Sequence, residues 1–258
     1  MRKNTNLIRV VIPTSEAESD DWNLAIAYAD KIATDPANGI KEVLLFVSSK
    51  RQLEKGALGR VAGERVAKTL HDKGRVTLSC GISMRAETLA TLPFASNGTL
   101  VLGFWVDENM MEKVDGMTGI SAVVAYPWLE DGIDKWIKIW APHIHGQVQT
   151  PSPPLLSDPV IVAALTSLTT CVNLSNTGLH GHYADQAERT LRILRAKNHL
   201  LEPDNIKLWA VKHGWHPNMA ADLQKKAKKV AELKAKPSLR SLEGAAATYD
   251  YWSSKSAP

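Results

Sequence analysis

The sequence predicts an α/β fold in which a doubly wound, mainly parallel five-stranded Rossmann-like sheet is followed by a small all-α domain. Two observations predict this class. Through the first 142 residues, short runs rich in Val, Ile and Leu alternate with amphipathic stretches, which is the pattern of βαβ units. Beyond a proline-rich segment, apolar residues recur only at helical spacing. With 258 residues and 44% hydrophobic composition, the chain is long enough to bury two such cores.

Five buried strands are expected in the first part, because their Val, Ile, Leu and Phe content suits burial on both faces of a sheet. They cover residues 7–12, 42–47, 76–81, 100–106 and 122–126. Helices are expected at 21–34, 51–73, 86–92, 107–115 and 129–141. Right-handed crossovers between such elements make the strands parallel, and we expect the flavodoxin-like order 2-1-3-4-5.

Proline positions predict the domain organisation. A segment rich in proline and turn-forming residues follows the last predicted helix of the α/β part and indicates a linker. Asp158 followed by Pro159 is typical of a helix start, and Pro237 ends the last amphipathic stretch. The expected parts are an α/β domain (1–142), a linker (143–157), a helical domain (158–236) and a flexible tail (237–258).

The net charge of +4 is unevenly distributed along the chain. Residues 143–258 carry 14 Lys and Arg against nine Asp and Glu, whereas residues 1–142 carry 17 against 18. This basic excess permits a nucleic-acid partner for the helical part, and it is equally the composition of a solvated basic face.

Cysteine content and hydropathy predict a cytoplasmic protein. Cys80 and Cys171 are too few for a disulfide framework, so we expect both to be small buried residues. The apolar segment near the N-terminus is too short for a signal-peptide core, and no apolar run approaches the length of a membrane span. We therefore expect no membrane partner.

A ligand site is expected at the carboxyl ends of the strands, near the point where the strand order reverses. The candidate ligand-binding residues are Thr14 and Ser15 after the first strand, Ser83 and Arg85 after the third, Asp107 after the fourth and Trp128 after the fifth. Hydroxyl groups and an arginine beside helix N-termini suit a phosphate or carboxylate, so we expect Ser15 and Arg85 to approach each other. Alternatively, the Ser, Thr and Asp residues are ordinary helix caps.

Specific cofactor motifs do not occur in the sequence. No G-x-G-x-x-G follows the first strand, and neither G-x-x-x-x-G-K-[ST] nor G-x-S-x-G is found, which argues against classical dinucleotide, P-loop and nucleophile-elbow chemistry. Gly56, Gly59 and Gly63 fall inside a predicted helix, where they favour close packing. The identity of any cofactor stays open.

The histidines form two H-x-H pairs. His143 and His145 lie in the predicted linker, and His180 and His182 precede a helix together with Asp185. A zinc site would need three or four such groups brought together by the fold. Because both pairs lie in turn-rich segments and Asp185 suits a helix cap, we expect exposed loops and no metal site.

The most informative feature of the helical part is a pair of helices joined by a short glycine-containing turn within IKLWAVKHGWHPNMAADL, from Ile206 to Leu223. The segment resembles the DNA-binding hairpin of actinobacterial H-NS-like nucleoid-associated proteins, in which a first helix with an I-x-x-W-A-x-x-x-G pattern precedes the second. It departs where that family carries the R-G-R that enters the minor groove, because this chain has His216-Pro217-Asn218.

A lysine cluster follows in the second helix of this pair. The candidate nucleic-acid-binding residues are Lys225, Lys226, Lys228 and Lys229. Such a cluster can neutralise phosphates, and it is also typical of an ordinary solvated helix face.

These observations together favour a non-enzymatic accessory or regulatory protein. In this hypothesis, the Rossmann-like domain senses a small anionic ligand or a partner, and the helical module contacts nucleic acid or protein. One alternative is an enzyme of nucleotide or phosphate-ester chemistry that uses Ser15, Arg85 and Asp107. Another is a structural subunit that uses some of its eight tryptophans at an interface, either with a partner or between copies in a homo-oligomer.

Overall fold

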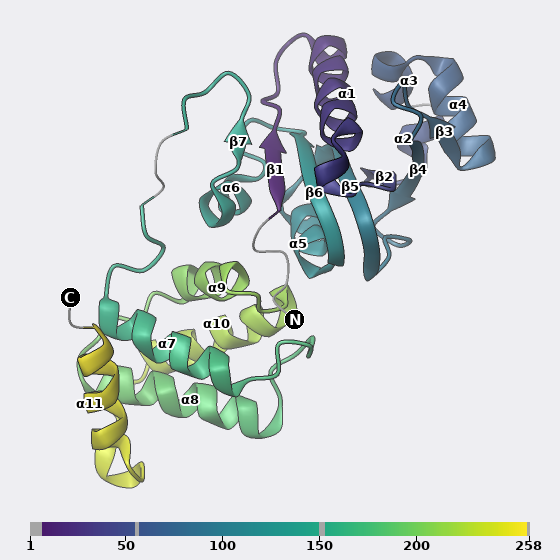
Figure 1. The fold of residues 1–258 in the computed structure, drawn as a ribbon. Helices are drawn as coiled ribbons and strands as arrows, with labels where there is room; N and C mark the ends of the chain where they lie inside the picture. Colours follow the sequence, from purple (N-terminus) through teal and green to yellow (C-terminus); the bar gives the residue numbers. More distant parts are fainter. Residues whose placement is uncertain (1–6, 55–56, 150–152, 257–258) are drawn as a thin grey trace. The chain divides into compact units, whose positions relative to one another are not determined.

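The computed structural model describes residues 7–54, 57–149 and 153–256 (Figure 1). The chain divides into two compact units, an α/β unit up to Ser152 and a helical unit from Pro153 onward. This boundary falls inside the predicted linker. Among the described residues, no helix has both the length and the apolar character needed to cross a membrane.

A seven-stranded sheet forms the centre of the α/β unit, with the order β3-β4-β2-β5-β6-β1-β7. Its strands are β1 (Ile8–Val11), β2 (Glu42–Val47), β3 (Arg75–Thr77), β4 (Ser83–Thr88), β5 (Ala95–Val106), β6 (Thr118–Pro127) and β7 (His143–Ile144). Every neighbouring pair is parallel except β3 and β4, which are antiparallel. The predicted α/β class and mainly parallel sheet are confirmed.

The predicted strand number and flavodoxin-like order are wrong. β1 pairs with β6 near one side of the sheet and does not lie next to β2. The expected third strand is instead a hairpin, because the chain turns at Gly81 (φ 83°) and returns as β4. β4 has the sequence SMRAET, and its charged residues are not typical of a buried strand. The prediction therefore placed residues 86–92 in a helix.

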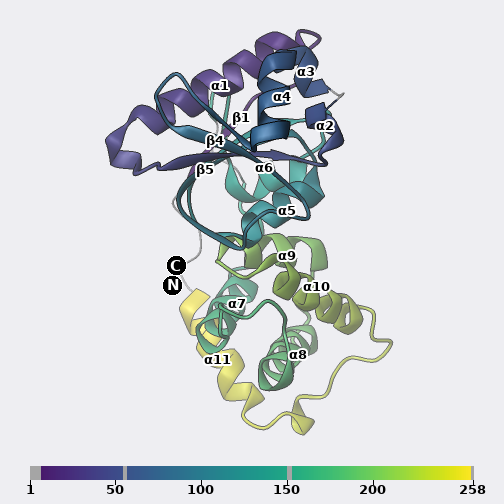
Figure 2. The ribbon, with the colours of Figure 1, turned by 90° about the vertical axis from the view of Figure 1, so that its right-hand side faces the viewer.

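Helices cover both faces of the sheet, as expected for a doubly wound domain (Figure 2). One face carries α1 (Glu18–Thr34), α2 (Arg51–Glu54), α3 (Ala57–Ala62) and α4 (Glu64–Lys73), with a 3-10 turn at Pro36–Asn38. The other face carries α5 (Glu108–Gly116) and α6 (Asp134–Trp140). The described residues of the single helix predicted over 51–73 belong to α2, α3 and α4, and Gly63, with φ 86°, separates α3 from α4; Gly56 lies outside the described residues.

The linker was predicted to begin too early. His143 and Ile144 form β7, which pairs with Val10 and Val11 of β1. The backbone N–H of His145 then donates to the carbonyl of Val11 at 2.9 Å. A two-residue edge strand has no periodicity that a sequence pattern can reveal.

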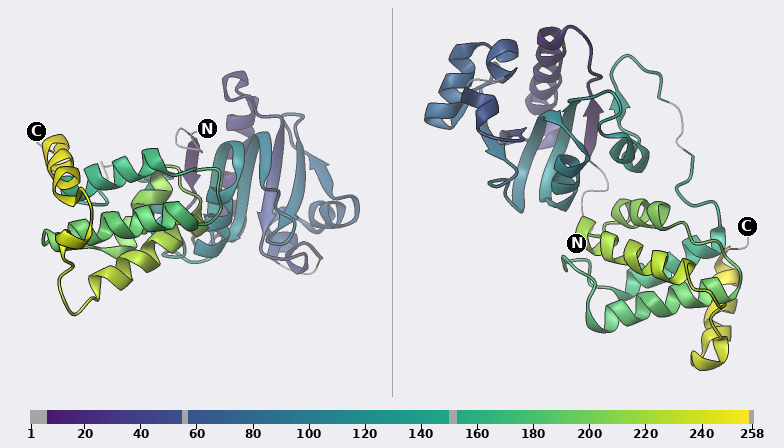
Figure 3. Two further views of the ribbon diagram at one scale, coloured as in Figure 1. Left: turned by 90° about the horizontal axis from the view of Figure 1, so that it is seen from below. Right: turned by 180° about the vertical axis from the view of Figure 1, so that it is seen from behind.

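The helical unit contains five α-helices within its described residues (Figure 3). They are α7 (Pro159–Cys171), α8 (Gly181–Ala196), α9 (Pro203–Lys212), α10 (Pro217–Ala231) and α11 (Ala245–Ser256), with a 3-10 turn at Leu239–Ser241. Their core includes Leu165, Leu191, Trp215 and Leu223, each at most 1% exposed. The all-α prediction for this part is therefore confirmed.

The predicted flexible tail is wrong over residues 245–256, which form α11. This helix packs mainly against α7, and Trp252 is only 3% exposed. Its alanine- and serine-rich composition suggested disorder, but one buried indole and the small Ala245 supply the packing face.

Both cysteines are free thiols, and neither is buried as predicted. Cys80 lies half-buried in the turn between β3 and β4, and Cys171 is exposed at the end of α7.

Candidate functional site

The carboxyl ends of β5, β6 and β1 meet at one edge of the sheet and bring four predicted site residues together. Thr14 follows β1, and its hydroxyl donates to the carbonyl of Pro127 at 2.7 Å. Trp128 follows β6, and its backbone N–H donates to the carbonyl of Val106 at 3.2 Å. Ser15 and Asp107 follow β1 and β5, so these four residues share the carboxyl edge of the sheet, which is where ligands of such folds usually bind.

Ser83 and Arg85 lie elsewhere, and the expected meeting of Ser15 with Arg85 is wrong. Ser83 is the first residue of β4, opposite Glu42 at the amino end of β2. Three strands, β2, β5 and β6, separate β4 from β1. Both predictions failed for the same reason: the strand that supplies these residues begins at Ser83, whereas we had expected it to end before Ser83.

Arg85 is held by carboxylates at the amino-terminal part of the sheet. Its Nε donates to Glu42 Oε2 at 3.1 Å, and its guanidinium also pairs with Glu87. Burial opposes ionisation of Glu42, but the hydrogen bonds from Arg85 and Ser96 outweigh it and lower the pKa of Glu42. The charge of Arg85 is thus paired within the sheet, and this residue does not lie at the carboxyl edge.

The polar groups at the carboxyl edge mostly satisfy one another. Asp107 caps α5 by accepting from the Met110 backbone N–H at 2.8 Å, which is the capping role considered above. Ser15 donates its backbone N–H and its hydroxyl to Asp21 at 2.7 and 2.9 Å. The Tyr126 hydroxyl reaches the same carboxylate at 3.5 Å, and burial raises the pKa of Tyr126. Ser15, Arg85 and Asp107 therefore do not form the cluster that the enzyme alternative requires.

The charge of this edge argues against the anionic ligand that we expected. The loops and first helical turns after β1, β5 and β6 carry Glu16, Glu18, Asp20, Asp21, Asp107, Glu108, Glu130 and Asp131. The same segments contain one basic residue, Lys135 in the first turn of α6, and Arg60 of α3 pairs with Glu18 at 3.6 Å, so the acidic residues far outnumber the basic ones. Acidic residues suit the positive ends of the helix dipoles, and here they also occupy the place that an anion would take.

Two large apolar side chains, supported by a third, are exposed at this edge. Trp105 sits in an irregularity of β5 between Phe104 and Val106, and its φ of 51° is strained for a bulky residue. Its ring meets that of Trp128, with centroids 4.1 Å apart. Trp128 is 50% exposed and the adjacent Leu129 is 56% exposed, so we call these two residues the Trp128–Leu129 ledge. Trp128 was among the predicted site residues and Trp105 was not, because backbone strain leaves no mark in composition.

The first H-x-H pair converges on a tyrosine. The Tyr28 hydroxyl lies 3.2 Å from His143 Nε2 and 3.1 Å from His145 Nδ1. The second pair belongs to the helical unit, where His182 contacts Gln186. Within the described residues, no group of three or more His, Cys, Asp or Glu side chains has an arrangement that could hold a metal ion.

The helical hairpin exists as α9 and α10, with Gly214 (φ 87°) in the turn between them. His216 is the N-cap of α10 and accepts from the Asn218 backbone N–H at 3.2 Å, so this tripeptide performs a capping function. The hairpin is anchored by Trp215, whose indole N–H donates to Thr169 at 2.9 Å.

The four candidate lysines differ in their environments. Lys226 is only 25% exposed and pairs with Glu188 of α8 at 3.3 Å. Lys225 is 78% exposed and pairs with Asp222 at 3.4 Å, while Lys228 and Lys229 are exposed. Only three of the four lysines therefore face solvent.

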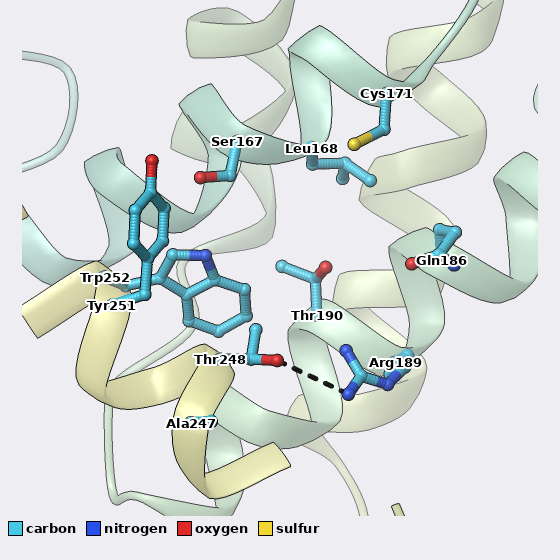
Figure 4. A pocket seen from close by; sticks show the side chains of 10 residues that line it. All are labelled: Ser167, Leu168, Cys171, Gln186, Arg189, Thr190, Ala247, Thr248, Tyr251 and Trp252. Atoms are coloured by element: carbon cyan, nitrogen blue, oxygen red, sulfur yellow. Dashed lines mark hydrogen bonds between the residues drawn. The ribbon is translucent and has the colours of Figure 1, made fainter. Parts of the chain in front are cut away.

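A pocket between α7, α8 and α11 was missed entirely (Figure 4). Arg189 and Thr190 of α8 and Thr248 and Trp252 of α11 line it. No sequence signal revealed it, because its third wall comes from the segment that we had predicted to be flexible.

Comparison with known proteins adds one match. Residues 157–253 match the model of a family described as a domain of unknown function, DUF1889. This range spans the helical unit from just before α7 to within α11 and includes all residues that line the pocket. No curated protein and no solved structure matches the chain.

Proposed function

We propose that this chain is a non-enzymatic accessory protein of the cytoplasm, with a regulatory role, whose α/β unit binds a partner protein at the carboxyl edge of its sheet. The Trp128–Leu129 ledge is the observation that carries this proposal. Tryptophan is enriched at the energetic centres of protein interfaces, and two adjacent large apolar side chains, each about half exposed, form such an anchor. The two free thiols support a reducing compartment.

The charges around the ledge indicate the chemistry of the partner. Glu130 and Asp131 continue the chain directly after the ledge, and the exposed Asp107 follows Val106, which pairs with Pro127 in the sheet. A partner segment with an apolar anchor flanked by lysine or arginine would complement this arrangement, because opposite charges at the rim steer association. A small anion is not what this edge favours.

Photo-crosslinking at the ledge tests the proposal. A photoreactive residue at Leu129 should give a discrete cross-linked protein in cells, and the same residue at Leu200, which is 77% exposed in the helical unit, should not give that adduct. The Trp128→Ser variant should lower recovery of this partner at least tenfold, as expected for an interface hot spot. Equal recovery with Trp128→Ser and with the control Leu200→Ser would refute the proposal.

A second candidate function, nucleic-acid contact by α10, is favoured by Lys225, Lys228 and Lys229. These three residues are spaced so that they share one face of the helix, and all are exposed. The resemblance of the hairpin to H-NS-like proteins points in the same direction, although the minor-groove tripeptide is replaced. Lys226 is left out of the proposed surface because it pairs with Glu188.

A salt titration tests this second candidate. Changing Lys225, Lys228 and Lys229 to Gln should flatten the log–log dependence of duplex-DNA affinity on salt by up to about 2.7, at roughly 0.9 per lost phosphate contact. The matched control changes Lys68, Lys73 and Lys113, three exposed lysines of the α/β unit, to Gln. Fluorescence anisotropy gives the slopes. Identical slopes for both triple variants would assign the α10 lysines to a solvated face.

A further inference from the structure

The pocket of the helical unit is large enough for a small organic molecule. Its volume is about 430 Å³, and it lies between α7, α8 and α11. This is within the usual size range of small-molecule sites. Leu168 and Trp252 provide apolar walls, and hydroxyl groups come from Ser167, Thr190 and Thr248.

Arg189 is the one charged residue among the described residues that line the pocket. Its Nη2 donates to the Glu243 carbonyl at 2.6 Å. The same atom lies 3.5 Å from the Thr248 hydroxyl, the contact drawn in Figure 4. Among the described residues, no carboxylate forms an ion pair with it. Three positions along the same helix, Arg192 pairs with Glu188 at 3.1 Å. Arg189 is thus half-buried, and among the described residues no carboxylate neutralises it, so its charge is available to an anion in the pocket.

Trp252 adds a second unsatisfied donor. Its side chain is almost fully buried, at 3% exposed, and it forms part of the pocket wall. Within the described part of the chain, its indole N–H has no hydrogen-bond acceptor, and it is not among the fully buried polar atoms that lack a partner, so it is accessible from the pocket. An acceptor atom of a ligand in the pocket can therefore reach it.

We infer that the helical unit binds a small organic carboxylate in this pocket, with the carboxylate on Arg189 and an apolar body against Trp252 and Leu168. A planar guanidinium matches a carboxylate in a two-bond geometry, and one positive charge balances a monoanion. The apolar walls distinguish this ligand class from inorganic phosphate. The site is separate from the ledge of the α/β unit and does not depend on that proposal.

Cys171 supplies a reporter, because its thiol lines the same pocket and is free. Cys80, the other free cysteine, lies in the α/β unit and serves as an internal reference. The rate of alkylation of each thiol by iodoacetamide can be followed by peptide mass spectrometry in the full-length protein. For a ligand as small as benzoate we expect a Kd of about 1 mM, so ~10 mM benzoate should slow labelling of Cys171 roughly tenfold and leave Cys80 unchanged.

Matched ligands and variants separate the two halves of the site. Benzamide, the neutral isostere, should protect Cys171 poorly, and inorganic phosphate should protect less than benzoate. Arg189→Gln should abolish protection, whereas Arg192→Gln, which removes a cation already paired with Glu188, should retain it. If circular dichroism shows that Arg189→Gln does not fold, Arg189→Lys replaces it. Protection should then weaken, because lysine lacks the planar guanidinium that makes two parallel hydrogen bonds to a carboxylate.

Three outcomes would overturn the inference. Equal protection by benzamide and benzoate would remove the role of the charge, and equal protection by phosphate would remove the role of the apolar wall. Unchanged labelling of Cys171 in wild-type protein at ~10 mM benzoate would remove the site, since at a Kd of about 1 mM it would be mostly occupied.

Discussion

Asp115 of the α/β unit and Asp158 of the helical unit both accept hydrogen bonds from nitrogen donors, but their pKa values are shifted in opposite directions. Asp115 accepts from the indole N–H groups of Trp136 at 3.2 Å and Trp140 at 3.0 Å. Asp158 lies 2.5 Å from His199 Nδ1 and accepts from the Val160 backbone N–H at 2.9 Å. In both cases ring nitrogens contact a partly buried carboxylate.

Their positions on helices explain the difference. Burial raises the pKa of Asp115 to about 7, and the indoles and the Arg9 guanidinium oppose this only in part. Asp115 lies in the last turn of α5, where the helix dipole also disfavours a negative charge. Burial acts in the same direction on Asp158, but His199 and the first amides of α7 outweigh it and lower its pKa. Two indole donors and a guanidinium therefore do not outweigh the burial of Asp115, whereas a helix N-terminus and an imidazole outweigh that of Asp158.

The largest expected effect concerns Asp115. Because its folded-state pKa is raised, its contribution to stability is present below the ordinary value of 3.8 and is lost as the pH rises to about 7. Between pH 5 and 8 the wild-type α/β unit should lose about 2–3 kcal/mol relative to Asp115→Asn, which cannot ionise. Pulse proteolysis in urea, with peptides of α5 and α6 identified by mass spectrometry, measures this loss. Parallel pH profiles for the two proteins would contradict the assignment.

The next effect concerns His199, which links Asp158 to the Tyr249 hydroxyl of α11 at 3.1 Å. His199→Gln should loosen the docking of α11 by about 1–3 kcal/mol, because half-buried partners on both sides, one of them charged, lose their hydrogen bonds. Hydrogen exchange should rise in residues 245–256 and stay constant in 217–231. The control His182→Gln removes an exposed imidazole and should change neither segment. Uniform loosening of both segments would show that His199 does not act through α11.

The smallest effect is expected for Tyr249→Phe. This change removes one hydroxyl but keeps the ring, over which Lys197 Nζ lies 4.5 Å from the centroid. Docking of α11 should weaken by about 0.5–1.5 kcal/mol, and Asp158 should keep its lowered pKa because His199 remains. Two-dimensional NMR of the Asp158 carboxyl carbon checks the second point. A Tyr249→Phe effect equal to that of His199→Gln would mean that the tyrosine, not the carboxylate, is the anchor.

The predictable parts of the fold are those in which residue type and burial agree. β2, β5 and β6 contain continuous apolar runs, and the helices α7 and α10 carry apolar residues at regular spacing. β4 could not be predicted, because Arg85 is accommodated by pairing with Glu42 of the neighbouring strand and with Glu87 of its own strand, and not by exposure. The prediction failed for α11 because this helix buries only Ala245 and Trp252, too few apolar residues to form a recognisable pattern.

The candidate site likewise has residues that the sequence placed correctly and residues that it did not. Thr14, Ser15, Asp107 and Trp128 were placed correctly because the carboxyl ends of parallel strands share an edge whatever their order. Arg85 was misplaced because its position depended on where one strand begins. The strain at Trp105 and the open charge of Arg189 arise only from tertiary structure, so no local pattern reports them.

The short strand β7 has a consequence for any attempt to produce the α/β unit alone. His143 and Ile144 cover the outer side of Val10 and Val11, and His145 completes this pairing. A recombinant fragment that ends at residue 142 would leave the apolar strand β1 with unpaired backbone groups, which is a template for strand-to-strand association between molecules. Extending the fragment by seven residues, to 149, keeps that edge covered and is the boundary we would choose for expression.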